Sequence, residues 1–92
     1  MRYICWEIIS YEERVPQTIY SEIDDFGYEV RKIEKYFDGT VGYASHDREE
    51  GKTLLADQMI PTVDELNMEN GIRARHLTSD EFKKLWFEYT QK

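Results

Sequence analysis

Apolar and polar residues alternate along much of this chain with the period of two that is typical of β-strands. In the segment at residues 2–9, Ile4, Trp6 and Ile8 share one face. The opposite face carries Cys5 and further apolar side chains, so the segment predicts a central strand. Alternation and the content of β-branched and aromatic residues predict further strands at residues 18–23, 28–37, 40–44 and 72–77.

Turn signals separate these predicted strands. Residues 24–27 read Asp-Asp-Phe-Gly and indicate a turn, and Asp38-Gly39 is a strong hairpin signal because both residue types tolerate a positive φ. Val30 and Ile33 are three residues apart, which breaks the period of two. We therefore expect a bulge or strong twist near Arg31 and Lys32.

Two segments in the second half of the chain begin like helices. Thr62 with Glu65, and Thr78 with Glu81, have the spacing of capping boxes. The first predicts a short helix at residues 61–67, and the second predicts a helix that runs to about Thr90. The later helix has an apolar stripe, which we expect to pack on the sheet face of Ile4, Trp6, Ile8 and Val30; the stripe comprises Phe82, Leu85, Trp86 and Tyr89.

Strands followed mostly by helix predict an α+β fold. We expect an antiparallel sheet of four to five strands, with the C-terminal helix packed on one face and a short helix before the last strand. The length of 92 residues suits one domain spanning residues 1–92, and 40% hydrophobic residues supply a modest core.

The net charge of −7 changes the functional picture. Residues 1–46 carry 5 basic and 9 acidic side chains, and residues 47–92 carry 7 and 10, so the excess is spread along the chain. An acidic surface repels phosphate backbones and anionic lipids, which disfavours direct nucleic-acid or membrane binding. It attracts basic protein partners; the alternative is that the charge serves solubility alone.

Cysteine use and the N-terminal residues predict a cytoplasmic protein. Cys5 is the one cysteine, so no intramolecular disulfide forms, as suits a reducing compartment. The apolar stretch at residues 1–9 is interrupted by Glu7 and is too short for a signal-peptide core or a membrane span.

No residue pattern predicts catalysis, a cofactor or a metal site. His46 and His76 are 30 residues apart and lack neighbouring ligands, so we expect a surface histidine and a half-buried strand histidine. Cys5 is expected to be a buried, weakly nucleophilic thiol. Gly51-Lys52-Thr53 lacks the upstream glycine of a phosphate-binding loop. We therefore expect a protein that is not an enzyme; a small enzyme of unrecognised type is a lesser alternative.

Basic and aromatic residues alternate in one predicted strand, but pairing with glutamates on neighbouring strands explains Arg31, Lys32 and Lys35 better than nucleic-acid stacking. The candidate partner-binding residues are instead acidic clusters in predicted turns and loops, together with aromatic side chains near them. Tyr11 and Phe26 are aromatic candidates of this kind. The residues that we predict to bind a partner are Glu12, Glu13, Tyr20, Asp24, Asp25, Asp47, Glu49 and Glu50.

Several segments resemble a widespread family of small bacterial proteins without an assigned activity. They cover nearly the whole chain: residues 19–25, 28–34, 38–39, 42–44, 60–67 and 78–86. The shared motifs are structural, namely a hairpin turn and two capping boxes, and they imply no catalytic residues.

Small acidic proteins of this kind resemble immunity proteins of contact-dependent inhibition and other polymorphic toxin systems. That resemblance implies a non-catalytic protein that binds a toxin domain with a basic surface, such as a nuclease, and occludes its active site. The alternative is an adaptor or regulatory domain for another protein partner.

Overall fold

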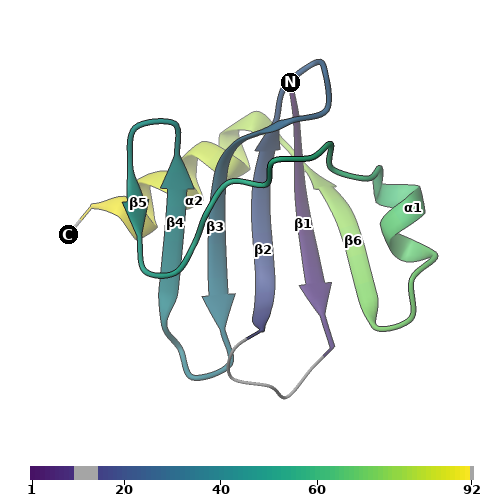
Figure 1. Cartoon of the computed structure of the whole chain (residues 1–92), viewed down its shortest axis with the longest axis horizontal. Helices are drawn as coiled ribbons and strands as arrows, with labels where there is room; N and C mark the ends of the chain where they lie inside the picture. The colour runs from purple at the N-terminus through teal and green to yellow at the C-terminus, as the bar shows by residue number, and fades with distance from the viewer. Residues whose placement is uncertain (10–14, 92) are drawn as a thin grey trace.

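The computed structural model describes residues 1–9 and 15–91 and has an α+β fold. Its antiparallel six-stranded sheet has the order β5-β4-β3-β2-β1-β6 (Figure 1). The elements are β1 (Arg2–Ile8), β2 (Pro16–Ile23), β3 (Glu29–Tyr36), β4 (Val41–Ser45), β5 (Glu49–Glu50), α1 (Val63–Asn67), β6 (Ile72–Leu77) and α2 (Ser79–Thr90).

The sheet has six strands, where the sequence predicted four to five. The additional strand is β5, which consists of Glu49 and Glu50 and pairs with Ala44 and Tyr43 of β4 at one edge of the sheet. Two consecutive glutamates show no alternation, so their pairing depends on β4 beside them and was not visible in the sequence. The other predicted strands and helices are confirmed to within two residues at each end.

The irregular spacing in β3 corresponds to a bulge, as predicted. Glu22 lies opposite Arg31, whereas Ile23 lies opposite Glu29, so Val30 is the additional residue. The bulge therefore precedes the expected position by one residue. It changes which β3 side chains face each side of the sheet.

Both predicted capping boxes are present. The Thr62 and Thr78 hydroxyls accept hydrogen bonds from the backbone of Glu65 at 3.2 Å and of Glu81 at 3.1 Å. Each glutamate carboxylate in turn accepts from the backbone N–H of the capping threonine at 2.9 Å. These reciprocal bonds fix the first turns of α1 and α2.

The two helices pack on opposite faces of the sheet (Figure 1). On the α2 side, the fully buried Phe82 lies 5.5 Å from Tyr3, measured between ring centroids. Trp86 meets Tyr43 edge-on at 5.6 Å. The apolar stripe of α2 therefore covers the face that carries Tyr3 and Tyr43.

The expected packing of α2 on the face of Ile4, Trp6, Ile8 and Val30 is wrong. Ile4 belongs to a second core on the opposite face, which α1 and the segment before it cover; this core contains Ile4, Ile23, Ile60, Val63, Leu66 and Ala74, with Trp6 packed against it. The alternation of apolar and polar residues could not decide which face of the sheet α2 covers, because β1 is apolar on both sides.

The short helix α1 is tied to the edge strand β6. The Asn67 side chain donates to the Ala74 carbonyl at 3.0 Å and accepts from the Ala74 N–H at 2.7 Å. One amide side chain thus satisfies backbone groups at the edge of the sheet, which blunts this edge against pairing with another strand.

Candidate functional site

The turn between β2 and β3 holds an aromatic side chain in solvent. Asp24 accepts hydrogen bonds through Oδ1 from the backbone N–H groups of Phe26 at 2.9 Å and Tyr28 at 3.0 Å. Gly27 has a φ of 94°, a conformation that glycine adopts without strain. The turn is thereby ordered, and it presents a Phe26 side chain that is 78% exposed.

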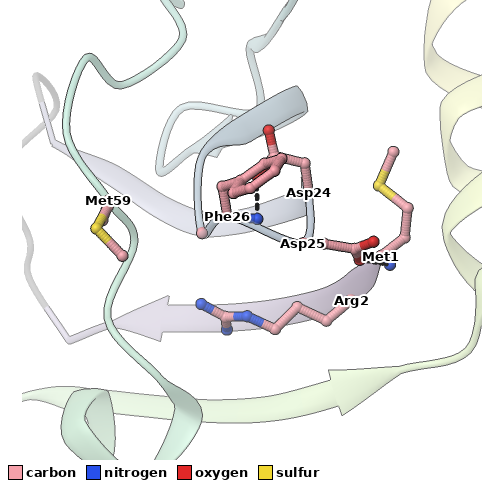
Figure 2. A pocket seen from close by; sticks show the side chains of 7 residues that line it. Met1, Arg2, Asp24, Asp25, Phe26 and Met59 are labelled. Atoms are coloured by element: carbon pink, nitrogen blue, oxygen red, sulfur yellow. Dashed lines mark hydrogen bonds and ion pairs between the residues drawn. The ribbon is translucent and has the colours of Figure 1, made fainter.

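A cavity of about 370 Å³ lies beside this turn, and Figure 2 shows the side chains around it. Arg2 extends beneath the turn, and Met59 lies on the facing segment. The guanidinium Nη2 of Arg2 donates to the Ile60 carbonyl at 2.9 Å, and the Ile60 N–H donates to the Gly27 carbonyl at 2.8 Å. These bonds bring Met59, which is 62% exposed, next to the Phe26 turn.

Asp25 lies in the turn between β2 and β3, and Asp47 lies in the turn between β4 and β5. These two turns are at the same end of the sheet (Figure 1). The Asp25 carboxylate contacts the Met1 amino group at 2.5 Å, and this contact lowers the pKa of Asp25. Asp47 accepts from the Ser45 hydroxyl at 2.9 Å in the turn between β4 and β5. Antiparallel connections therefore bring these predicted partner-binding residues toward one end of the molecule.

The remaining predicted residues are distributed differently. Glu49 and Glu50 form the exposed edge strand β5. Tyr20 is half-buried on the α2 side of the sheet, away from the acidic turns. Glu12 and Glu13 lie outside the described residues, as does Tyr11.

A second hollow, the α2 groove, runs between α2 and the sheet and has a volume of about 680 Å³. Tyr20 and Leu77 contribute from β2 and β6, and Leu85 and Phe87 contribute from α2. Its charged residues are Arg75, Glu81, Lys84 and Glu88. Sequence reasoning identified Tyr20 but missed the groove, because its residues come from three separate elements.

A row of buried polar side chains lies beneath the segment that joins β5 to α1. The Ser21 hydroxyl donates to Glu29 Oε2 at 2.8 Å, and the Ala56 N–H donates to Glu29 Oε1 at 2.8 Å. The Lys32 ammonium lies 3.2 Å from the same carboxylate and donates to the Leu54 carbonyl at 3.0 Å. These groups satisfy one another, so their role is to fix the crossing segment on the sheet.

On the α2 side, Arg31 pairs across strands as predicted. Its guanidinium donates to both carboxylate oxygens of Glu22, at 2.5 Å and 2.9 Å, and lies 5.2 Å from the ring centroids of Phe82 and Trp86. Burial raises the pKa of Glu22, but the hydrogen bonds and charge of Arg31 outweigh it, so this pKa lies below its ordinary value. The pair therefore anchors α2 to the sheet.

The residues considered for catalysis do not converge. Cys5 is buried, and burial is the main cause that raises the pKa of its thiol, as expected. His46 is exposed, and His76 is also exposed, where a half-buried position was expected. Among residues 1–9 and 15–91, no group of three or more His, Cys, Asp or Glu side chains is arranged to hold a metal ion. The same part of the chain has no helix that is long and apolar enough to cross a membrane.

Comparisons with known proteins identify the family. Neither the curated proteins nor the solved structures include a match to this chain. A family model described as a domain of unknown function, DUF6881, matches residues 2–91. The chain therefore belongs to the DUF6881 family.

Proposed function

We propose that this chain is a non-catalytic protein-binding domain whose partner has a basic surface. In its most specific form, the proposal is an immunity protein that binds a toxin domain, such as a nuclease, and occludes its active site. The observation that carries it is the uneven distribution of charge over the two faces of the sheet.

The face opposite α2 is strongly acidic. Residues 51–70 cross this face, and they contain four acidic side chains but only one basic one. These four side chains are exposed, as is Glu49, which pairs with Ala44 on the same face; the five are Glu49, Asp57, Asp64, Glu65 and Glu69. Charges gathered in this way steer a basic partner toward one face and raise its association rate.

On the α2 side, basic and acidic side chains of the described residues are nearly balanced. The basic side chains are Arg31, Lys35, Arg48, Arg73, Arg75, Lys83 and Lys84, and the acidic ones are Glu7, Glu22, Glu50, Asp80, Glu81 and Glu88. The net charge of −7 thus resides mainly on the other side, which gives the proposed partner a preferred direction of approach.

The turn at Phe26 supplies an apolar contact within this acidic surface. Phe26 and Met59 are 78% and 62% exposed, and both line the cavity next to Asp24 and Asp25. Exposed aromatic side chains with a polar rim are frequent centres of binding energy at protein interfaces. We infer that Phe26 contacts the partner while the surrounding carboxylates orient it.

Growth rescue tests the proposal. Coexpression of this chain should restore growth to cells that produce the toxin domain encoded beside its gene, and the purified proteins should form a one-to-one complex. Phe26→Ser should weaken the complex by at least about tenfold, because an interface anchor is lost. Phe87→Ser is the matched control, because it makes the same substitution at a phenylalanine that is 65% exposed on α2, on the other face of the sheet.

Failure to bind or protect against that toxin would overturn the immunity proposal. An adaptor with a basic partner uses the same acidic surface, so the two functions differ in partner and not in mechanism. A pull-down from native cytosol that returns a stoichiometric basic protein, lost with Phe26→Ser but not with Phe87→Ser, would favour the adaptor.

A further inference from the structure

The α2 groove lies on the opposite side of the sheet from the acidic face. Helix α2 packs mainly against β1, β2 and β4, and it runs behind the sheet from the end of β6 toward the opposite edge (Figure 1). This course leaves Leu77 of β6 and Tyr20 of β2 beside an open space of about 680 Å³. Phe87 lies at this groove and is 65% exposed.

The charges around the groove are balanced. Arg75 and Lys84 are basic, and Glu81 and Glu88 are acidic. Glu81 is already held in the capping box of α2, which leaves Glu88 as the acidic side chain available to a partner. A groove with mixed charge gives no net attraction to a strongly basic or strongly acidic protein.

Balanced charge does suit another copy of the same chain. Two chains of net charge −7 repel each other when their acidic faces meet, but the balanced α2 side avoids most of this repulsion. An isologous two-fold contact also requires that each surface complement itself. Lys84 and Glu88 meet this condition, because antiparallel α2 helices can place each Lys84 opposite the Glu88 of the other copy.

We propose that a second copy of this chain occupies the α2 groove in a two-fold dimer. The Phe87 ring of each chain enters the groove of the other and contacts the apolar side chains there. Lys84 and Glu88 pair reciprocally at the rim. A dimer interface of standard size buries about 800 Å² per subunit, a small share of the 6248 Å² surface of one chain.

The dimer is compatible with the proposed function but does not depend on it. The groove and the acidic surface lie on opposite faces of the sheet, so a dimer leaves both acidic surfaces open. Each dimer would then bind two partner molecules. The self-association test below uses this chain alone, so its outcome is independent of any toxin.

Analytical ultracentrifugation of the full chain from about 10 μM to 1 mM, a range that spans weak self-association, tests the proposal. The expected mass approaches twice the 11.1 kDa of one chain as concentration rises. Phe87→Ser should weaken the dimer at least about tenfold, and Met68→Ser should leave it unchanged. Far-UV dichroism and thermal unfolding of each variant establish that it is folded.

A charge exchange tests the reciprocal pairing. Lys84→Glu and Glu88→Lys should each weaken the dimer, because each places like charges opposite one another. The double variant K84E/E88K should recover most of the lost affinity. A wild-type chain that stays monomeric over the whole range would overturn the proposal, as would a dimer that Phe87→Ser leaves unchanged or a double variant weaker than both single variants.

Discussion

Replacement of Gly42 by alanine is a sharp test of how the crossing segment sits on the sheet. A Cβ at this position in β4 would lie 2.1 Å from the Thr53 hydroxyl oxygen, 3.0 Å from the Glu50 carbonyl oxygen and 3.1 Å from Thr53 Cβ. Thr53 is only 1% exposed, so its side chain has little space into which to turn. The space left by the absent side chain of Gly42 is thus occupied by Thr53.

The sign of the change in unfolding free energy distinguishes this steric contact from the general preference of strands for alanine over glycine. Within a strand, alanine is favoured over glycine by about 0.5–1 kcal/mol when nothing obstructs it. Overpacking in a well-packed core costs about 1–3 kcal/mol. With contacts this short, the second effect should dominate, and Gly42→Ala should lower the free energy of unfolding by about 1–2 kcal/mol.

Urea unfolding followed by tryptophan fluorescence measures this change, with Thr53→Ala and the double variant G42A/T53A as references. Thr53→Ala removes the nearest clashing atom, so the double variant should be more stable than the sum of the single effects by at least about 0.5 kcal/mol. The Glu50 carbonyl remains, so recovery should be incomplete. A neutral or stabilising Gly42→Ala, or strictly additive effects, would refute the proposed packing.

Three further experiments test other parts of the structure. Phe82→Ala should destabilise the fold by about 3–5 kcal/mol because this ring is fully buried. Phe87→Ala in the same helix should destabilise the monomer by less than about 1 kcal/mol. Similar losses of stability for the two variants in urea unfolding would contradict the orientation of α2. Arg31 lowers the pKa of Glu22 below its ordinary value of 4.5. The ionised carboxylate therefore contributes stability that is present above the unfolded-state pKa and is lost as the pH falls through the folded-state pKa. Glu22→Gln should be less stable than the wild type at pH 7 and approach it near pH 2, and a constant difference across this range would contradict the pairing. The Cys5 thiol, with its pKa raised chiefly by burial, should react with iodoacetamide far more slowly in the folded chain than in urea, as followed by mass spectrometry; equal rates would show that it is accessible.

Local signals in the sequence predicted most of the secondary structure. The capping boxes at Thr62 and Thr78 and the turn at Gly39 depend on residues within a few positions of each other, so they are visible without the fold. The bulge at Val30 follows from one break in alternation. The strand β5 was missed because Glu49 and Glu50 pair only through their neighbour β4.

Features that depend on the choice between faces were not predictable. The two sides of β1 are both apolar, so periodicity could not assign α2 to the side of Tyr3 instead of that of Ile4. Charged β3 residues such as Glu29 and Lys32 resemble solvent-exposed positions in the sequence. They are buried because a distant segment covers them, and that segment supplies hydrogen-bond partners.

The candidate binding surface was predicted in part. The acidic turn residues and Phe26 were identified from composition and turn signals. Met59 lies 33 positions from Phe26 in the sequence, and only the backbone bond between Gly27 and Ile60 brings it to the same cavity. Asp24 also has a structural role, because its carboxylate holds the turn.

The rate of association with the proposed basic toxin partner tests the central claim most directly. Stopped-flow measurements should compare E49Q/D57N on the acidic side with E7Q/D80N on the α2 side, since both double variants remove two negative charges. We predict that association slows as salt rises, that E49Q/D57N reduces the rate about threefold to tenfold at low salt with little change in dissociation, and that E7Q/D80N changes it less than about twofold. A rate that is independent of salt, or equal effects of the two double variants, would contradict the claim that the acidic face receives a basic partner.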